Sequence, residues 1–211
     1  MSRELRQELI ETALAMNASG INQGTSGNLS LRTGDGMMIT PSGIRYSSLE
    51  PEDIVQVAMD GACAGHRAPS SEWRIHRDIY REREDARAIV HAHPEASVTL
   101  AALRRPIPAF HYMVAVAGGK DIRCADYATF GTQDLSHHVL AALNGRKACL
   151  MANHGLICLE RNLTRALDLA IEVEHLASAY RQCLALGDPV ILDDAEMERV
   201  LKKFSNYGSE V

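Results

Sequence analysis

The chain has 211 residues, of which 46% are hydrophobic. This apolar content is enough for one sizeable core, and the length predicts a single domain over residues 1–211. Its 22 basic and 27 acidic residues are interspersed and give a net charge of -5, so we expect neither a nucleic acid nor a membrane as a partner. We expect no secretory signal and no membrane-spanning helix, and five cysteines without a Cys-x-x-Cys pair favour the reducing cytoplasm.

Helical and strand patterns alternate through the first half of the chain. Apolar residues recur three and four apart in the helical segments, whereas the strand segments alternate or form a short apolar run between turn residues. In chain order, the expected elements are a helix at 1–18, a hairpin of strands at 28–32 and 37–40, a strand at 54–59, a helix capped by Ser70 or Ser71 that runs to about Arg83, and a strand at 88–93.

The second half is richer in helices. In chain order, the expected elements are a helix at 95–103, extended chain at 107–113, a helix at 132–143, extended chain at 148–152, a long helix from Asn162 to Leu186 and a last helix from Asp193 to Phe204. Asn162 is a helix cap, and Asp193 with Glu196 has the spacing of a capping box. Strands and helices therefore interleave, which predicts an α/β core whose sheet is at least partly antiparallel.

Two histidines one residue apart, His91 and His93, end the buried strand predicted at 88–93. Side chains on a strand alternate between its faces, so both imidazoles point the same way and can form half of a zinc site. Taken alone, such a pair is more often hydrogen-bonded or coincidental, and it ligates a metal in roughly one case in four. The pair therefore predicts a metal only if other ligands join it.

Two further residues can complete the set. His154 is followed by a glycine at a tight turn between two short apolar runs, which is typical neither of a surface position nor of a simple core position. Glu72 lies at the start of a predicted helix, where an acidic residue is often only a partner of the helix dipole. Beside a metal the same carboxylate can act as a fourth ligand or a general base. Together the three histidines and Glu72 make a catalytic zinc the leading hypothesis.

Three loops rich in small residues flank predicted elements, at residues 24–28, 41–43 and 70–71. Backbone N–H groups and hydroxyls in such loops can hold an anion, and the serine pair also lies at a helix N-terminus. Ordinary turn chemistry explains each loop by itself, and no Walker-type or Gly-x-Gly-x-x-Gly spacing is present. Phosphate capture and turn formation both remain open for these loops.

One tyrosine is a candidate proton donor. Tyr112 precedes the glycine-containing turn at 117–120, and a phenol can transfer a proton. On the sequence alone, a half-buried packing role for Tyr112 is the preferred interpretation.

Seven segments in combination resemble the class II aldolase/adducin family. They lie at residues 22–28, 39–43, 69–73, 91–93, 111–113, 127–132 and 153–156, and the similarity extends from the first helix to residue 208. The resemblance implies a three-layer α/β/α fold with a mostly antiparallel central sheet. It also implies a cyclic homotetramer with active sites at the subunit interfaces.

The resemblance also implies roles for individual residues. His91, His93 and His154 would hold Zn²⁺, and Glu72 would ligate the resting metal and then act as an acid/base. The residues implied to bind the substrate phosphate are Gly27, Asn28, Ser42, Gly43, Ser70 and Ser71. Tyr112 would come from a neighbouring subunit and serve the aldehyde oxygen. The residues implied to line the aldehyde end are Phe130, Phe204 and Tyr207.

The implied reaction is the reversible cleavage of a ketose 1-phosphate, of the L-fuculose 1-phosphate type, to dihydroxyacetone phosphate and an aldehyde. A 5-deoxyribulose or 5-methylthioribulose 1-phosphate is an alternative substrate, because Asn153 stands where the resemblance leads us to expect a histidine. A pentulose 5-phosphate 4-epimerase shares the fold but carries aspartate in place of Glu72. The intact histidine set opposes a metal-free scaffold, and the absence of a His-Glu-x-x-His helix opposes a zinc hydrolase.

Overall fold

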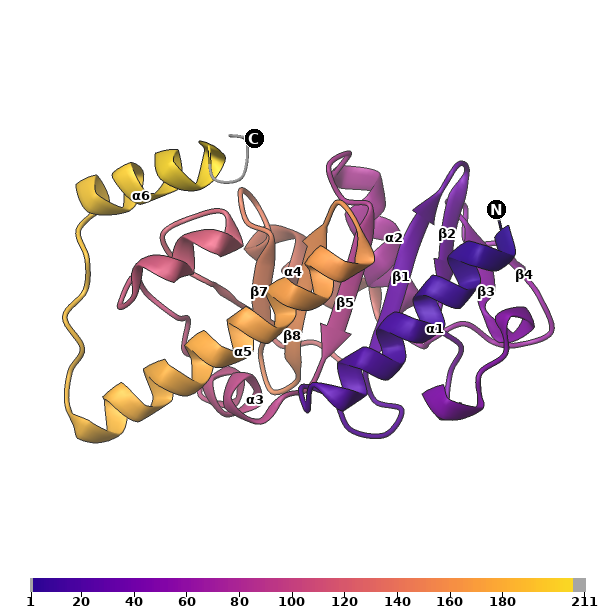
Figure 1. Cartoon of the computed structure of the whole chain (residues 1–211), viewed down its shortest axis with the longest axis horizontal. Coiled ribbons are helices and arrows are strands. Elements are labelled where there is room, and N and C mark those ends of the chain that lie inside the picture. Colours follow the sequence, from indigo (N-terminus) through magenta and orange to yellow (C-terminus); the bar gives the residue numbers. More distant parts are fainter. Residues whose placement is uncertain (1, 207–211) are drawn as a thin grey trace.

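The computed structural model describes residues 2–206. Its strands form one eight-stranded sheet in the order β4-β3-β2-β1-β5-β8-β7-β6 (Figure 1). Neighbouring strands are antiparallel except for β6 and β7, which are parallel. The strands are β1 Asn28–Thr33, β2 Gly36–Ile39, β3 Val55–Ala58, β4 Cys63–Ala64, β5 Ala88–Ala92, β6 Cys124–Ala125, β7 Ala148–Met151 and β8 Gly155–Glu160.

Helices cover both faces of the sheet. In Figure 1, α1 and α5 cross the front of the sheet, while α2 and α4 lie behind it. The helices are α1 Ser2–Ala18, α2 Trp73–Glu82, α3 Glu95–Ala102, α4 Gln133–Ala142, α5 Leu163–Leu186 and α6 Asp194–Asn206, with 3-10 turns η1 Tyr46–Ser48, η2 Pro51–Asp53 and η3 Tyr112–Ala117. The predicted three-layer fold with a mostly antiparallel sheet is therefore confirmed.

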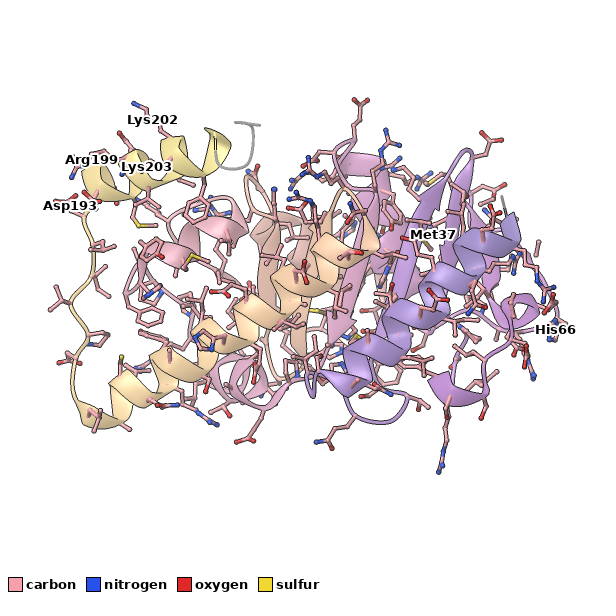
Figure 2. The ribbon with its side chains drawn as sticks, viewed as in Figure 1. Met37, His66, Asp193, Arg199, Lys202 and Lys203 are labelled. Atoms are coloured by element: carbon pink, nitrogen blue, oxygen red, sulfur yellow. The ribbon has the colours of Figure 1, made fainter. Side chains whose placement is uncertain are left out.

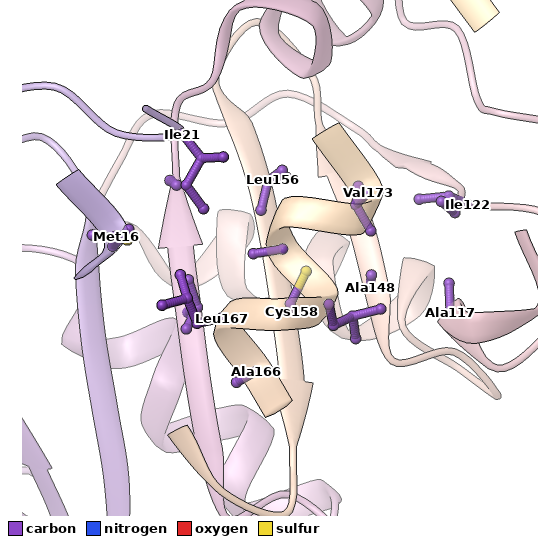
Figure 3. Close-up of a cluster of buried hydrophobic side chains, with 14 of the residues drawn as sticks. Met16, Ile21, Ala117, Ile122, Ala148, Leu156, Cys158, Ala166, Leu167 and Val173 are labelled. Atoms are coloured by element: carbon purple, nitrogen blue, oxygen red, sulfur yellow. The ribbon is translucent and has the colours of Figure 1, made fainter. Parts of the chain in front are cut away.

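The strands have an apolar layer on each side, which holds the three layers together. Figure 3 shows part of the layer beneath α1 and α5, where Met16, Leu156 and Val173 are fully buried. The opposite layer, beneath α2 and α4, includes Ile75 and Val139. Burial of apolar side chains on both faces makes the middle strands a rigid platform for the side chains at their ends. None of the helices in the described part of the chain has the length and apolar surface that crossing a bilayer requires.

Most predicted elements are confirmed, including both helix caps in the second half. The side chains of Asn162 and Asp193 accept hydrogen bonds from the backbone N–H groups of Arg165 and Glu196, in the first turns of α5 and α6. The helix predicted after the serine pair begins later, at Trp73. Ser70 instead closes the preceding turn, where its hydroxyl accepts a 3.3 Å hydrogen bond from the N–H of Glu72.

The extended chain predicted at 107–113 is wrong in its second half. Ile107 does pair with Ile122 as an isolated bridge, but η3 begins at Tyr112. The side chain of His111 accepts a 3.2 Å hydrogen bond from the N–H of Met113, and this local bond stabilises a turn in place of a strand.

Candidate metal centre

Four side chains converge at one end of the central strands β5 and β8. Glu72 occupies the N-cap position of α2, His91 lies in β5, His93 follows that strand, and His154 lies in the turn between β7 and β8. One ligand atom from each residue can be chosen so that all four lie within 4.8 Å of one another. The structure therefore brings together the four residues that the sequence predicted as a metal site.

The turn between β7 and β8 has the backbone conformation that places His154 against β5. Asn153 has a φ of 55°, in the left-handed region that asparagine tolerates better than most residues. A Cβ at Gly155 would lie 2.4 Å from the carbonyl oxygen of Ala92 and 2.7 Å from the ring of His93. Glycine at 155 is therefore what lets the turn approach His93 so closely.

The partners of His91 decide which of its nitrogens faces the site. Its Nδ1 lies 2.7 Å from the carbonyl oxygen of Leu156, so this nitrogen carries a proton and donates it. Its Nε2 then points into the cluster, 2.9 Å from Oε2 of Glu72. Burial lowers the pKa of His91, but the charge and hydrogen bond of Glu72 outweigh burial and raise it.

The other titratable groups are held in the forms that bind a cation. Burial raises the pKa of Glu72, but the positive charge of His91 and further interactions outweigh burial and hold that pKa well below its usual range. Burial and the charge of His91 lower the pKa of His93 to about 3 and that of His154 to about 4. At neutral pH the cluster therefore offers one carboxylate and two neutral imidazoles, those of His93 and His154.

Two contacts within the cluster are unfavourable unless a cation joins it. Oε1 of Glu72 is buried without a hydrogen-bond partner, although it lies 3.3 Å from His154. Nε2 of His91 lies 2.8 Å from Nε2 of His93 and 2.9 Å from Oε2 of Glu72, and its single proton cannot serve both acceptors. A divalent cation in place of that proton would satisfy both, and three imidazoles with a carboxylate are a donor set that suits zinc. The residues present therefore fit a metal ion.

Two of the three predicted anion-binding loops lie side by side next to this cluster. Pro41 bridges Pro69, and the N–H of Ser70 donates a 3.0 Å hydrogen bond to the carbonyl of Thr40. This pairing holds the Ser42–Gly43 turn against the serine pair that precedes Glu72.

The third loop ends at Gly27, which is packed against β5. A Cβ at Gly27 would lie 2.7 Å from the carbonyl oxygen of His91, so glycine allows this loop to touch the metal strand. The next residue, Asn28, pairs directly opposite His91 across the sheet and donates a 3.1 Å hydrogen bond to Oε2 of Glu72. The structure thus brings Gly27 and Asn28 to the metal cluster.

A cavity of about 390 Å³ opens over the metal cluster. Its walls include Ser71 of the serine pair, the aromatic Phe130, and three of the four metal-site residues, which are Glu72, His93 and His154. Phe130 is exposed on one side of this cavity. One hollow therefore combines an anion loop, the metal donors and an apolar wall.

Tyr112 and Phe204 lie elsewhere in the chain. They stack with ring centroids 6.5 Å apart and line a second cavity of about 880 Å³ between η3 and α6. Charged side chains of α6, among them Arg199 and Lys203, line the α6 side of this cavity (Figure 2). Tyr112 is 50% exposed, so one chain alone does not bring it into the metal cavity. Tyr207 lies outside the described residues.

Three residues near the site were missed from the sequence. Ser30, His76 and Tyr80 are buried and continue the hydrogen bonding of Asn28 away from Glu72. Their spacing was a usable signal, because His76 and Tyr80 follow Glu72 at steps of four residues and therefore share one face of α2.

The comparisons with known proteins agree with this arrangement. The family model described as Class II Aldolase and Adducin N-terminal domain matches residues 7–181. The chain belongs to this family.

Two curated relatives and one solved structure illustrate how close the similarity is. The chain is 56% identical over 204 residues to the 5-methylthioribulose-1-phosphate/5-deoxyribulose-1-phosphate aldolase of Rhodospirillum rubrum, covering 97% of this chain and 92% of that protein. It is 50% identical to the L-fuculose phosphate aldolase of Escherichia coli strain K12, covering 99% and 97%. A solved L-fuculose 1-phosphate aldolase superposes with a TM-score of 0.93 at 43% identity, covering 96% of each chain.

The protein is accordingly a class II aldolase, which is a metal-dependent lyase. The donor cluster supplies the metal site that the family's chemistry needs.

Proposed function

We propose that the protein is a zinc-dependent aldolase that reversibly cleaves a ketose 1-phosphate to dihydroxyacetone phosphate and an aldehyde. The observation that carries this proposal is the shared cavity, in which the donor cluster of Glu72, His93 and His154 lies beside Ser71 of an anion-binding loop. A phosphate held by the loops places the adjacent carbons of a short sugar within reach of the metal donors. The three histidines favour zinc among the divalent metals.

The anion loops bind and orient the substrate in this proposal. Their backbone N–H groups and hydroxyls hold the phosphate, and the residues that take part are Gly27, Asn28, Ser42, Gly43, Ser70 and Ser71. A left-handed φ of 73° at Gly43 turns the chain sharply after Ser42. Fixing the phosphate converts the later steps into reactions within one complex, which lowers their entropic cost.

The remaining residues handle protons and the aldehyde. Cleavage of the C3–C4 bond requires the C4 hydroxyl to lose a proton and leaves negative charge on the three-carbon fragment. When bound, zinc supplies electrophilic stabilisation of that charge. Glu72 takes up a proton and delivers it to C3, which balances the proton lost from the C4 hydroxyl, and its buried carboxylate lies beside the same donors for this step. No lysine Schiff base is part of this proposal.

Tyr112 serves the aldehyde oxygen from a neighbouring subunit, and Phe130, Phe204 and Tyr207 line the aldehyde end. This assignment makes the active unit a homotetramer with sites at subunit interfaces. Its support is that Tyr112 and Phe204 are stacked together but line a cavity separate from that of Glu72 within one chain. Light scattering of the purified protein tests the assembly, and a monomer that retains full turnover would overturn it.

The proposal also covers the organisation and location of the protein. We propose one catalytic domain over residues 1–211, since both apolar layers lie on one continuous sheet. We also propose a cytoplasmic location, which the five unpaired cysteines support.

The substrate remains a choice between two sugars. An L-fuculose 1-phosphate type is supported by the solved structure with a TM-score of 0.93, and a 5-deoxyribulose or 5-methylthioribulose 1-phosphate by the relative at 56% identity. Release of dihydroxyacetone phosphate from each sugar, measured with a coupled dehydrogenase, separates them. Release from either sugar supports the aldolase. Conversion of a pentulose 5-phosphate to its epimer, without any release, would establish the rival 4-epimerase instead.

A further inference from the structure

A chain of hydrogen-bonded side chains runs through the apolar layer between α2 and the sheet. Glu72, His76 and Tyr80 are four residues apart and share one face of α2, while Asn28 and Ser30 share one face of β1. Each hydrogen bond in this series joins a side chain of α2 to a side chain of β1. All five side chains belong to residues no more than 5% exposed.

The distances make the chain continuous from Glu72 to Tyr80. Nδ2 of Asn28 lies 3.1 Å from Oε2 of Glu72, and Oδ1 of Asn28 lies 2.6 Å from Nε2 of His76. Nδ1 of His76 lies 2.6 Å from the hydroxyl of Ser30, which lies 2.8 Å from the hydroxyl of Tyr80. Each of these distances is that of a direct hydrogen bond.

The direction of every bond follows from one fact, which is that an ionised carboxylate only accepts. Asn28 must therefore turn its amide nitrogen to Glu72 and its oxygen to His76, so Nε2 of His76 carries a proton. Burial, with a smaller contribution from the charge of His91, lowers the pKa of His76 to about 3, so the ring is neutral and its Nδ1 accepts. Ser30 must then donate to His76 and accept from Tyr80. Four donors therefore point in series toward Glu72.

We propose that His76, supported from behind by Ser30 and Tyr80, is a positioning residue that fixes the amide of Asn28 and thereby the carboxylate of Glu72. This rests on the proposed function in so far as Asn28 and Glu72 act on the substrate. Without the donor of His76, the amide of Asn28 can rotate. In the rotated orientation its oxygen faces the carboxylate of Glu72, and the two oxygens repel each other. A loop residue proposed to hold phosphate would then lose the orientation that links it to the proposed acid/base.

The tautomer of His76 tests the direction of the chain without any activity measurement. Protein labelled with ¹⁵N-histidine would give two-bond ¹H–¹⁵N correlations, and His76→Gln would identify the signals of that ring. We expect a neutral ring protonated at Nε2 between pH 5 and 9, with and without zinc. Protonation at Nδ1 or a charged ring in this range would overturn the proposal. In Ser30→Ala, which removes the donor to Nδ1, we expect the Nδ1-protonated form to become detectable.

Three variants at saturating zinc test the consequence for turnover. His76→Leu introduces an apolar side chain of similar reach that has no hydrogen-bond donor, and we expect a loss in kcat of about 10- to 100-fold. His76→Gln keeps an amide donor toward Asn28, and we expect it to recover kcat to within about threefold of the unsubstituted protein. The control is Ser136→Ala, which removes a 2.6 Å hydrogen bond between α4 and Asp78 on the same helix α2. We expect Ser136→Ala to lose stability without losing turnover.

A double-mutant cycle with Asn28 decides whether His76 acts through that residue. If it does, His76→Leu adds less than about threefold to the loss in Asn28→Ala, whereas independent actions would multiply. Multiplied losses, or a His76→Leu variant with unchanged kcat, would overturn the proposal. If His76→Leu does not fold, Ser30→Ala takes its place in the cycle. Failure of the unsubstituted protein to release dihydroxyacetone phosphate would instead refute the proposed function, and the tautomer measurement would still test the chain.

Discussion

Replacement of Glu72 by glutamine removes the charge of the carboxylate while keeping its shape. Oε2 of Glu72 contacts both Nε2 of His91 at 2.9 Å and Nδ2 of Asn28 at 3.1 Å. An amide cannot present an oxygen to both of these partners and to His154 without turning its own NH₂ toward one donor. The variant also has no group that can carry a proton to the substrate. General acid–base catalysis contributes about 10²- to 10⁴-fold, so we expect kcat to fall by that factor, which corresponds to about 3–5 kcal/mol in activation free energy.

The assay is the rate of dihydroxyacetone phosphate release by Glu72→Gln, with zinc content measured in the same sample. Its matched control is Glu160→Gln, because Glu160 is a largely buried carboxylate paired with Lys147 at 2.6 Å at the other end of β8. We expect the control to turn over within about twofold of the unsubstituted protein, as is usual for a change away from the site. Turnover of Glu72→Gln within threefold of the unsubstituted protein would reduce Glu72 to a structural residue.

Three more perturbations follow from the same geometry. His93→Ala should abolish both zinc binding and cleavage, measured by metal analysis and product release, and a zinc-loaded active variant would contradict the donor set. Tyr112→Phe should lower kcat while leaving competitive inhibition by inorganic phosphate unchanged; equal kcat would return Tyr112 to a packing role. Burial raises the pKa of Asp78, but hydrogen bonds, led by that of Ser136, outweigh burial and lower it. Its stabilisation is therefore present above the unfolded-state pKa of about 4 and lost as pH falls through the folded pKa. Urea unfolding of Asp78→Asn should show a loss of about 1–3 kcal/mol at pH 7 and a smaller loss at pH 3, whereas equal losses would refute this linkage.

Local patterns in the sequence predicted the parts of the site that depend on neighbouring residues. The alternation of side chains on a strand was sufficient to place His91 and His93 on one side of β5. The glycine after His154 was sufficient to mark a tight turn, and the structure shows why glycine is needed there. Helix caps were equally local, and Asn162 caps α5 as expected.

The convergence of the site depends on contacts between distant segments, which no local pattern contains. Glu72 meets His91 only because β1 and β5 pair and α2 packs behind them. The sequence offered nine histidines and no spacing that singled out His154. The order of the strands and the parallel pairing of β6 with β7 could likewise not be predicted, because they are pairings between segments far apart in the sequence. The turn at Tyr112 was missed because a hydrogen bond from the backbone N–H of Met113 to the side chain of His111 overrides the extended preference of the segment.

The central claim is that the cluster of Glu72, His91, His93 and His154 holds one catalytic zinc ion per chain. The most direct test is to strip the protein with EDTA, remove the chelator and titrate zinc back while measuring dihydroxyacetone phosphate release. We predict that release disappears on stripping and returns in proportion to added zinc until one ion is bound per chain. Release that persists in fully stripped protein, or that stays absent after zinc has rebound, would contradict the claim.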